Sequence, residues 1–233
     1  AYFPLALCYL RMMKNPGDSF CQKAIECLNM TENKYHVLCK VMLAMIYYDG
    51  ILASKDEEKS FLLYTELVNT TNREYLHNNL GVILKNGSQS VPKNIPLAIE
   101  YFETAIKQGD IFALFNLSRM YFYGEGVPKN IDKAAALLDK LNMSQFDISI
   151  VLDYIQLHPT MSTQLFKESS DNCDMNQLLP SSYRHLFPKK CFDSIDFVYS
   201  IDYLPFVDVL SETLNCKPLK SKIVTTAFYE GLL

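Results

Sequence analysis

Histidine, cysteine and acidic side chains are the groups in this sequence that could carry out chemistry. The four histidines lie far apart and form no HExxH or similar pair; they are His36, His77, His158 and His185. A zinc site of that type needs two histidines on one face of a helix. We therefore expect no metal site and no cofactor.

One pair of residues resembles a thiol nucleophile and its base. Cys191 follows His185 in the sequence, and an imidazole can take the proton of a cysteine that lies within hydrogen-bond reach. Such a pair is defined by its geometry in space, which nearness in sequence does not supply. We therefore predict no catalytic residue and no enzymatic activity.

Two short segments that resemble ligand sites have simpler explanations. The acidic run 56–58 opens a predicted helix, where carboxylates complement the helix dipole, so we interpret it as a cap rather than a metal site. Gly124-Glu125-Gly126 does not form a phosphate loop, because no strand precedes it and no Lys-Ser/Thr follows it. The net charge of −4 argues against a nucleic-acid partner, since no basic surface attracts phosphate.

The composition indicates a protein with a large core. The chain has 233 residues, of which 49% are hydrophobic, enough for one extended domain or two smaller ones. No apolar run is long enough to span a bilayer, because the best one, residues 41–48, has the length of a core helix. No secretory signal is visible. Since Ala1 is not a start methionine and a helix-like pattern begins at once, we expect a fragment or a processed product.

The seven cysteines bear on the cellular compartment. Their number is odd, no CxxC occurs, and they do not recur at equivalent positions as the staples of a repeat would; they are Cys8, Cys21, Cys27, Cys39, Cys173, Cys191 and Cys216. We interpret them as thiols that pack as small apolar residues. This interpretation predicts a cytoplasmic protein.

Five Asn-x-Ser/Thr sequons favour a different compartment. They begin at Asn29, Asn69, Asn86, Asn116 and Asn142, whereas roughly two would arise by chance for so short a motif. Asn116 falls inside a predicted helix and would be a poor glycosylation site. The endoplasmic reticulum lumen or the secretory pathway is therefore the alternative location.

The element most clearly specified by the sequence is a helical hairpin at residues 113–141. Its first helix has small and apolar residues on one face, at Ala113, Leu117, Ser118 and Tyr121. Glycines at 124 and 126 end this helix, and Pro128 bars its continuation. A second amphipathic helix then presents Lys133, Ala134, Leu137, Leu138 and Leu141. A single hairpin cannot bury its apolar side, so stacked copies are required.

The chain contains four such copies. Gly50, Gly87 and Gly124 recur every 37 residues, and Leu43, Leu80 and Leu117 keep the same step. A period of this length with a helix-turn-helix in each unit is typical of an α-solenoid. The recurring glycines suit a left-handed position after each first helix. Small residues at 6, 44, 81 and 118 indicate close helix crossings, and we expect one at residue 81.

These motifs resemble the Sel1-like repeat family, which is related to tetratricopeptide repeats. The fourth copy carries them most fully, at Ala113, Leu117, Tyr121, Gly124, Gly126, Val127, Lys133 and Ala134. The third copy matches at Leu80, Gly81, Gly87, Val91, Ala98, Tyr101, Phe102, Ala105 and Gly109, and the first two are degenerate. The resemblance implies right-handed superhelices that act as adaptors in endoplasmic-reticulum degradation, cell-wall synthase activation, mitochondrial assembly and bacterial virulence.

We therefore predict an all-α protein, a right-handed α-solenoid of helix-turn-helix repeats with a less regular, mainly helical C-terminal segment. Residues 1–144 hold the four repeats, and 145–168 form a helical cap. Residues 169–190, rich in Ser, Asn, Asp and Pro, form a loop or linker. Residues 191–233 make the C-terminal segment, in which a short strand near 223–228 remains an alternative.

The predicted binding surface is a row on the first helices. When each first helix is numbered from residue 39, 76 or 113, positions 3, 7 and 10 lie opposite the hairpin core, at about 100° per residue. They are Val41, Met45 and Tyr48; Asn78, Val82 and Lys85; and Phe115, Arg119 and Phe122. First helices line the concave face of such a solenoid, so this row could be a groove for an extended peptide or a partner helix. Alternatively, neighbouring repeats or the C-terminal segment bury it.

The sequence thus predicts a non-enzymatic adaptor or scaffold that binds a protein partner or a peptide segment on the concave face. Two alternatives stay open. One is a lumenal adaptor in endoplasmic-reticulum quality control, and the other is the regulatory solenoid of a larger enzyme. Nothing in the sequence predicts an oligomeric state.

Overall fold

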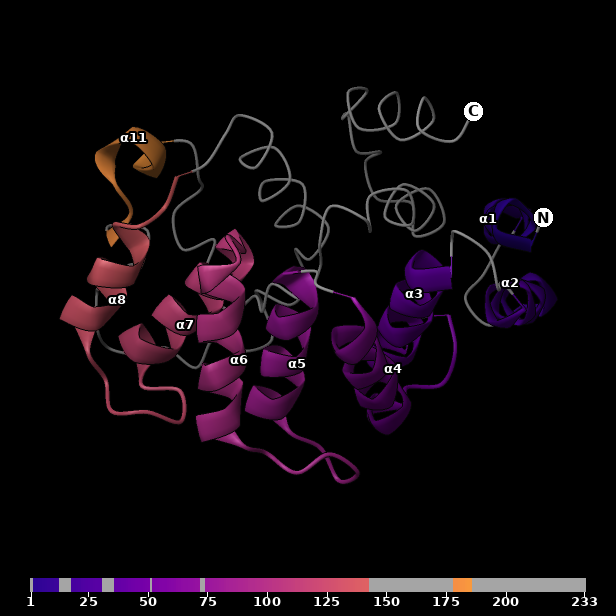
Figure 1. Cartoon of the computed structure of the whole chain (residues 1–233), viewed down its shortest axis with the longest axis horizontal. Coiled ribbons are helices and arrows are strands. Elements are labelled where there is room, and N and C mark those ends of the chain that lie inside the picture. The colour runs from indigo at the N-terminus through magenta and orange to yellow at the C-terminus, as the bar shows by residue number, and fades with distance from the viewer. Residues whose placement is uncertain are drawn as a thin grey trace. The chain divides into compact units, whose positions relative to one another are not determined.

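The computed structural model describes residues 2–12, 18–30, 36–50, 52–71, 74–142 and 178–185. These residues contain helices, turns and loops but no strand, which confirms the all-α prediction (Figure 1). The helices are α1 (Tyr2–Met12), α2 (Ser19–Asn29), α3 (His36–Asp49), α4 (Glu57–Thr70), α5 (Glu74–Asn86), α6 (Ile95–Lys107), α7 (Ile111–Tyr123), α8 (Ile131–Leu138) and α11 (Ser181–Arg184). The predicted cap at 145–168 and the segment 191–233 lie outside these ranges, as does most of the predicted loop 169–190.

Successive helices pack as hairpins within two compact units. The first unit includes α1 to α4 together with residues 88–92, and the second includes α5 to α8 and α11. In the first unit α1 packs on α2, α2 on α3, and α3 on α4. In the second, α5 packs on α6, α6 on α7, and α7 on α8, while α5 also contacts α7 (Figure 1). Each unit therefore stacks its hairpins in sequence order, as the repeat pattern predicts.

The glycines that follow the first helices adopt the predicted left-handed conformation. Gly87 has φ +65° and Gly124 has φ +78°. Their amides donate to carbonyl oxygens of the last helical turn, from Gly87 to Ile83 at 2.9 Å and from Gly124 to Met120 at 2.9 Å. A Cβ on Gly87 would also lie 2.6 Å from Cβ of Lys93. Conformation and space therefore both require glycine at this turn.

Gly81 lies where α5 and α6 cross closely, as the sequence predicts. A Cβ built on it would stand 2.7 Å from Cε1 of Phe102. Phe102 belongs to α6 and is among the largest fully buried side chains. The absence of a side chain at residue 81 thus provides the space for this ring.

The connectors into the second helices close in the same way in successive hairpins. The amide of Asn94 donates to the carbonyl of Leu84 at 2.9 Å, and that of Asn130 to Tyr121 at 2.7 Å. The side chain of Asn130 then accepts from the amide of Lys133 at 2.9 Å. Asp56 accepts equally from the amide of Lys59 at 2.9 Å, which confirms its predicted role as a helix cap.

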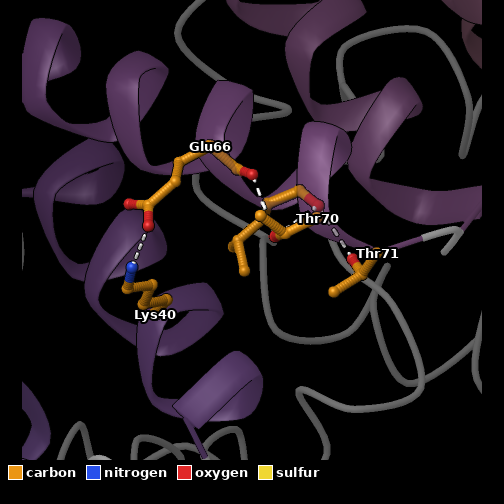
Figure 2. A network of polar contacts seen from close by, with 5 residues as sticks. Lys40, Glu66, Thr70 and Thr71 are labelled. Carbon is orange, nitrogen blue, oxygen red and sulfur yellow. Dashed lines mark hydrogen bonds and ion pairs between the residues drawn. The ribbon is translucent and has the colours of Figure 1, made fainter.

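Polar contacts also fix α4 within the first unit (Figure 2). The ammonium of Lys40 on α3 pairs with the carboxylate of Glu66 on α4. At the end of α4 the hydroxyl of Thr70 donates to the carbonyl of Glu66 at 3.0 Å, and that of Thr71 to the carbonyl of Leu67 at 2.9 Å. The carbonyl of Leu67 also accepts from the backbone amide of Thr71 at 2.8 Å, so the hydroxyl of Thr71 adds a second hydrogen bond at the end of α4.

Candidate functional site

Most of the predicted binding row is buried in the structure. Tyr48 on α3 is half-buried. The other members are 5% exposed or less; they are Val41, Met45, Asn78, Val82, Lys85, Phe115, Arg119 and Phe122. The row is therefore packed rather than an open groove, which agrees with the alternative stated above. Its role in partner binding remains a prediction.

Two neighbouring first helices bring buried amides together. On α7, Nδ2 of Asn116 donates to Oδ1 of Asn78 on α5 at 2.8 Å. Nδ2 of Asn78 in turn lies 3.3 Å from Oδ1 of Asn79. All three side chains are buried, although amides normally remain at the surface. A polar connection therefore runs across the contact of α5 with α7.

Two buried cations from the same two helices, α5 and α7, meet one carboxylate. Nζ of Lys85 and Nη2 of Arg119 each lie 3.2 Å from Oε2 of Glu125. The two cationic side chains are 6% exposed, whereas that of Glu125 is 34% exposed. Burying a charge costs several kcal/mol unless an opposite charge compensates it. This cluster is therefore arranged to hold a carboxylate on a side chain that is itself partly exposed.

The backbone fixes the position of Glu125. Its amide donates to the carbonyl of Met120 at 2.9 Å, directly after the left-handed Gly124. Gly126 also has a positive φ, +75°, and a Cβ on it would lie 2.6 Å from Cδ1 of Ile95. The two flanking glycines thus define the backbone turn that carries Glu125.

The described residues contain no cluster that could hold a metal ion and no helix that could span a membrane. Within these ranges no three His, Cys, Asp or Glu gather where they could hold a metal ion. No described helix is long and apolar enough to cross a bilayer. Cys191, the thiol that the sequence analysis considered as a nucleophile with His185 as its base, lies outside the described residues.

The described Cys27 shows no sign of an activated thiol. Burial, and secondarily the charge of Glu26, raises the pKa of its thiol.

Comparison with known families explains the repeating contacts. The family model described as "Sel1 repeat" matches residues 38–67, 75–110 and 111–141, which correspond to the hairpins α3–α4, α5–α6 and α7–α8. These three segments are Sel1 repeats. The match starts at residue 38, so the assignment of α1 and α2 to a first, degenerate repeat remains a prediction.

Two curated proteins share a short stretch with this Sel1 repeat chain. "Cytochrome c oxidase assembly factor 7" of Xenopus tropicalis is 39% identical over 62 residues. "Cytochrome c oxidase assembly factor 7A" of Xenopus laevis is 36% identical over 62 residues. In both cases the match covers 27% of this chain and 27% of the relative. The chain thus spans about a quarter of the length of these relatives.

Two solved structures resemble this chain at low sequence identity. The protein c5321, a protective antigen of uropathogenic Escherichia coli strains that displays an SLR fold, gives a TM-score of 0.50 at 18% identity, covering 66% of this chain and 32% of that one. A Sel1 repeat protein from Oxalobacter formigenes gives a TM-score of 0.44 at 23% identity, covering 51% and 48%. The likeness to c5321 shows the solenoid fold alone.

Three residues of the buried polar cluster are absent from the sequence prediction. Asn79 and Asn116 occupy the same position in successive Sel1 repeats, 37 residues apart, which was a usable signal. The sequence analysis considered Asn116 only as a possible glycosylation site. Its burial inside α7 supports the prediction that it is a poor one. Glu125 sits between two turn glycines, and nothing in the sequence indicates that its carboxylate turns toward the cations.

Proposed function

We propose that this Sel1 repeat chain is a non-enzymatic adaptor that binds a protein partner or a peptide segment along the first helices of its repeats. The observation that carries the proposal is the pairing of buried Lys85 and Arg119 with Glu125, on the two helices whose buried amides Asn78 and Asn116 also bond to each other. Buried polar groups cost stability in an otherwise apolar stack, where hydrophobic residues of similar volume often do as well or better. Their presence here supports a role in recognition.

The chemistry of the cluster suits one class of partner. Side-chain amides can donate to and accept from the backbone of an extended peptide. Two convergent cations suit a carboxylate. Because Glu125 is the most exposed of the three charged residues, its carboxylate is the group that a partner's acidic side chain would replace. The proposed partner segment therefore carries apolar side chains and an acidic group.

The names of the two frog relatives support an adaptor role. They are called assembly factors, and we extend to this chain the general idea of a helper that works through protein contacts. The relatives match over 27% of their length, so no particular partner is carried over. We propose a cytoplasmic location on the basis of the cysteine pattern.

A peptide pair tests this function directly. The probes are two labelled peptides, one alternating Leu with Glu and the other alternating Leu with Gln, titrated with the full chain by fluorescence anisotropy. We expect the Glu peptide to bind about tenfold more tightly or better. Lys85→Met and Arg119→Met should each remove that preference, because each deletes one cation of the cluster. Glu125→Gln should strengthen Glu-peptide binding, because the internal competitor is lost.

Two matched controls make the result decisive. Lys107→Met removes an exposed cation from α6, outside the cluster, and should leave the preference intact. Melting curves of each variant exclude unfolding as the cause. Equal binding of the two peptides to the folded wild-type chain would contradict the acidic-partner proposal.

A further inference from the structure

The end of α5 places an exposed asparagine directly before a glycine. Asn86 is the last residue of α5 and is exposed, and Gly87 follows it with φ +65°. No other asparagine in the sequence is followed by glycine. In the deamidation of asparagine the main-chain nitrogen of the next residue attacks the side-chain carbonyl, and a glycine there leaves the attack unhindered. Among the asparagines of this chain, Asn86 therefore has the sequence context that favours deamidation most.

The fold restrains the attacking nitrogen without burying the group that it attacks. The amide of Gly87 donates to the carbonyl of Ile83 at 2.9 Å, which occupies the N–H that must lose its proton before attack. The side chain of Asn86 stays exposed. Helix ends open locally at a much lower cost in free energy than the whole fold. The reaction therefore needs only the last turn of α5 to open.

We propose that Asn86 is a site of spontaneous deamidation in the folded chain. After the turn opens, the deprotonated nitrogen of Gly87 bonds to Cγ of Asn86. The bond from Cγ to Nδ2 then breaks, and Nδ2 leaves as ammonia. Water hydrolyses the resulting five-membered succinimide at either of its two carbonyls. One hydrolysis leaves aspartate at residue 86, and the other leaves isoaspartate, whose main chain runs through the former side chain.

The two products should differ in their effect on the turn. The equivalent position at the end of α3 is Asp49, which is followed by Gly50 with φ +69°. An aspartate at this repeat position is therefore compatible with the left-handed glycine. Isoaspartate instead adds one carbon to the main chain directly before Gly87, where a built Cβ would already lie 2.6 Å from Cβ of Lys93. We therefore expect the isoaspartate form, and not the aspartate form, to disrupt the turn.

The disrupted turn would also carry one of the cations of the proposed partner site. Lys85 directly precedes Asn86 in the last turn of α5, and its Nζ lies 3.2 Å from Oε2 of Glu125. Isoaspartate at residue 86 should therefore loosen Lys85 and reduce the preference of the chain for the Glu peptide. This consequence rests on the proposed function, whereas the deamidation itself does not.

The chain contains a matched control site for the reaction. Asn29 is also exposed and is the last residue of its helix, α2. The amide of Met30 after it donates to the carbonyl of Glu26 at 3.0 Å, as the amide after Asn86 donates within α5. The two asparagines thus share helix position, exposure and this backbone hydrogen bond, but a side chain follows only Asn29. Rates measured in urea remove the other contacts that the fold gives to each side chain.

The experiment follows both asparagines in the full chain, produced in bacteria so that no glycan occupies the sequons. The folded chain and the chain unfolded in urea are incubated at neutral and at mildly alkaline pH. Mass spectrometry of tryptic peptides measures the conversion at each asparagine, and methylation by an isoaspartyl methyltransferase identifies isoaspartate. Asn86→Gln is the control variant, because its longer side chain would have to form a six-membered ring.

In the folded chain we expect Asn86 to convert at least about tenfold faster than Asn29, since no side chain hinders the attack. The conversion should accelerate with pH, and the melting temperature should fall as isoaspartate accumulates in the wild type but not in Asn86→Gln. The proposal is overturned if Asn86 stays intact in the folded chain while it converts in urea, or if both asparagines convert equally fast. Conversion to isoaspartate with an unchanged preference for the Glu peptide would contradict only the effect on the partner site.

Discussion

The ammonium of Lys133 lies 2.6 Å from the hydroxyl oxygen of Tyr121 and 4.1 Å from the centroid of its ring. The same pair recurs two hairpins earlier, in α3–α4, where the ammonium of Lys59 lies 2.7 Å from the hydroxyl oxygen of Tyr47 and 4.0 Å from the centroid of its ring. Each pair ties the start of a second helix to the end of the first helix. In the hairpin α5–α6 both positions are leucine, Leu84 and Leu97. These two repeat positions therefore differ together between hairpins: they hold a tyrosine and a lysine in α3–α4 and α7–α8, and two leucines in α5–α6.

The contact should be measurable as a coupling energy. In a double-mutant cycle of Tyr121→Leu and Lys133→Met, we expect the sum of the two single-variant losses to exceed the loss in the double variant by about 0.5–1 kcal/mol. The value is modest because Lys133 is exposed and solvent screens its charge. Urea unfolding of the four proteins provides the free energies of unfolding. If the losses in the free energy of unfolding are strictly additive, the contact between the two side chains does not contribute to stability.

The sequence predicted best those features of the fold that depend on backbone conformation and local space. The positive φ of Gly87 and the crossing at Gly81 follow from one residue type at one repeat step, because other side chains would clash or strain there. The cap at Asp56 follows equally from a local rule. Such features depend on short stretches of chain, so a single sequence contains the information.

The accessibility of the binding row was not predictable in the same way. Helical periodicity places Phe122 and Arg119 opposite the hairpin core, but burial depends on every element that packs on the helix, not on its own period. The convergence of Lys85, Arg119 and Glu125 depends on one connector and two helices that are not consecutive. Sequence position alone does not bring these three groups together.

The close crossing at residue 81 predicts a specific stability loss. Gly81→Leu should lower the free energy of unfolding by about 1–3 kcal/mol or more, because the new side chain would enter the space of the Phe102 ring. Gly109→Ala is a useful control. Gly109 has φ +100° and nothing within 4 Å of a built Cβ, so its substitution reports backbone strain without a clash. A wild-type melting temperature for Gly81→Leu would refute the repeat register.

The burial of the row predicts that its aromatic members contribute to the core. Phe122 and Leu117 are both 1% exposed. We expect Phe122→Ala to cost about 3–5 kcal/mol and Leu117→Ala about 2–5 kcal/mol. Tyr48→Ala should cost clearly less, because Tyr48 is half-buried. Thermal melts of the three variants decide the matter: a Phe122→Ala protein as stable as wild type would indicate that the row opens to solvent.

Acid should weaken a contact at the start of α4. Burial alone would raise the pKa of Glu57, but hydrogen bonds from Lys55 and Ser88 and the charge of Lys55 outweigh it, and the pKa lies below its ordinary value. A depressed carboxyl pKa stabilises the folded state above the unfolded pKa of about 4.3. That stabilisation is lost as the pH falls through the folded pKa. Urea unfolding of wild type and Glu57→Gln at pH 7 and near pH 3 should therefore show the larger acid loss in the wild type. If both proteins lose the same free energy of unfolding between pH 7 and pH 3, Glu57 does not contribute to the acid sensitivity of the fold.

The sequons allow the proposed location to be tested. Four of the five sequon asparagines are exposed, at Asn29, Asn69, Asn86 and Asn142, whereas Asn116 is buried inside α7. A cytoplasmic protein is not reached by the lumenal glycosylation machinery, so its intact mass should not change on treatment with a glycosidase. The measurement uses protein isolated from its native source, with a known glycoprotein as the control for enzyme activity. A glycosidase-sensitive mass shift would assign the chain to the secretory pathway instead. In that case mapped glycans should occur on the exposed asparagines and be absent from Asn116, because its side chain is closed off in the folded chain.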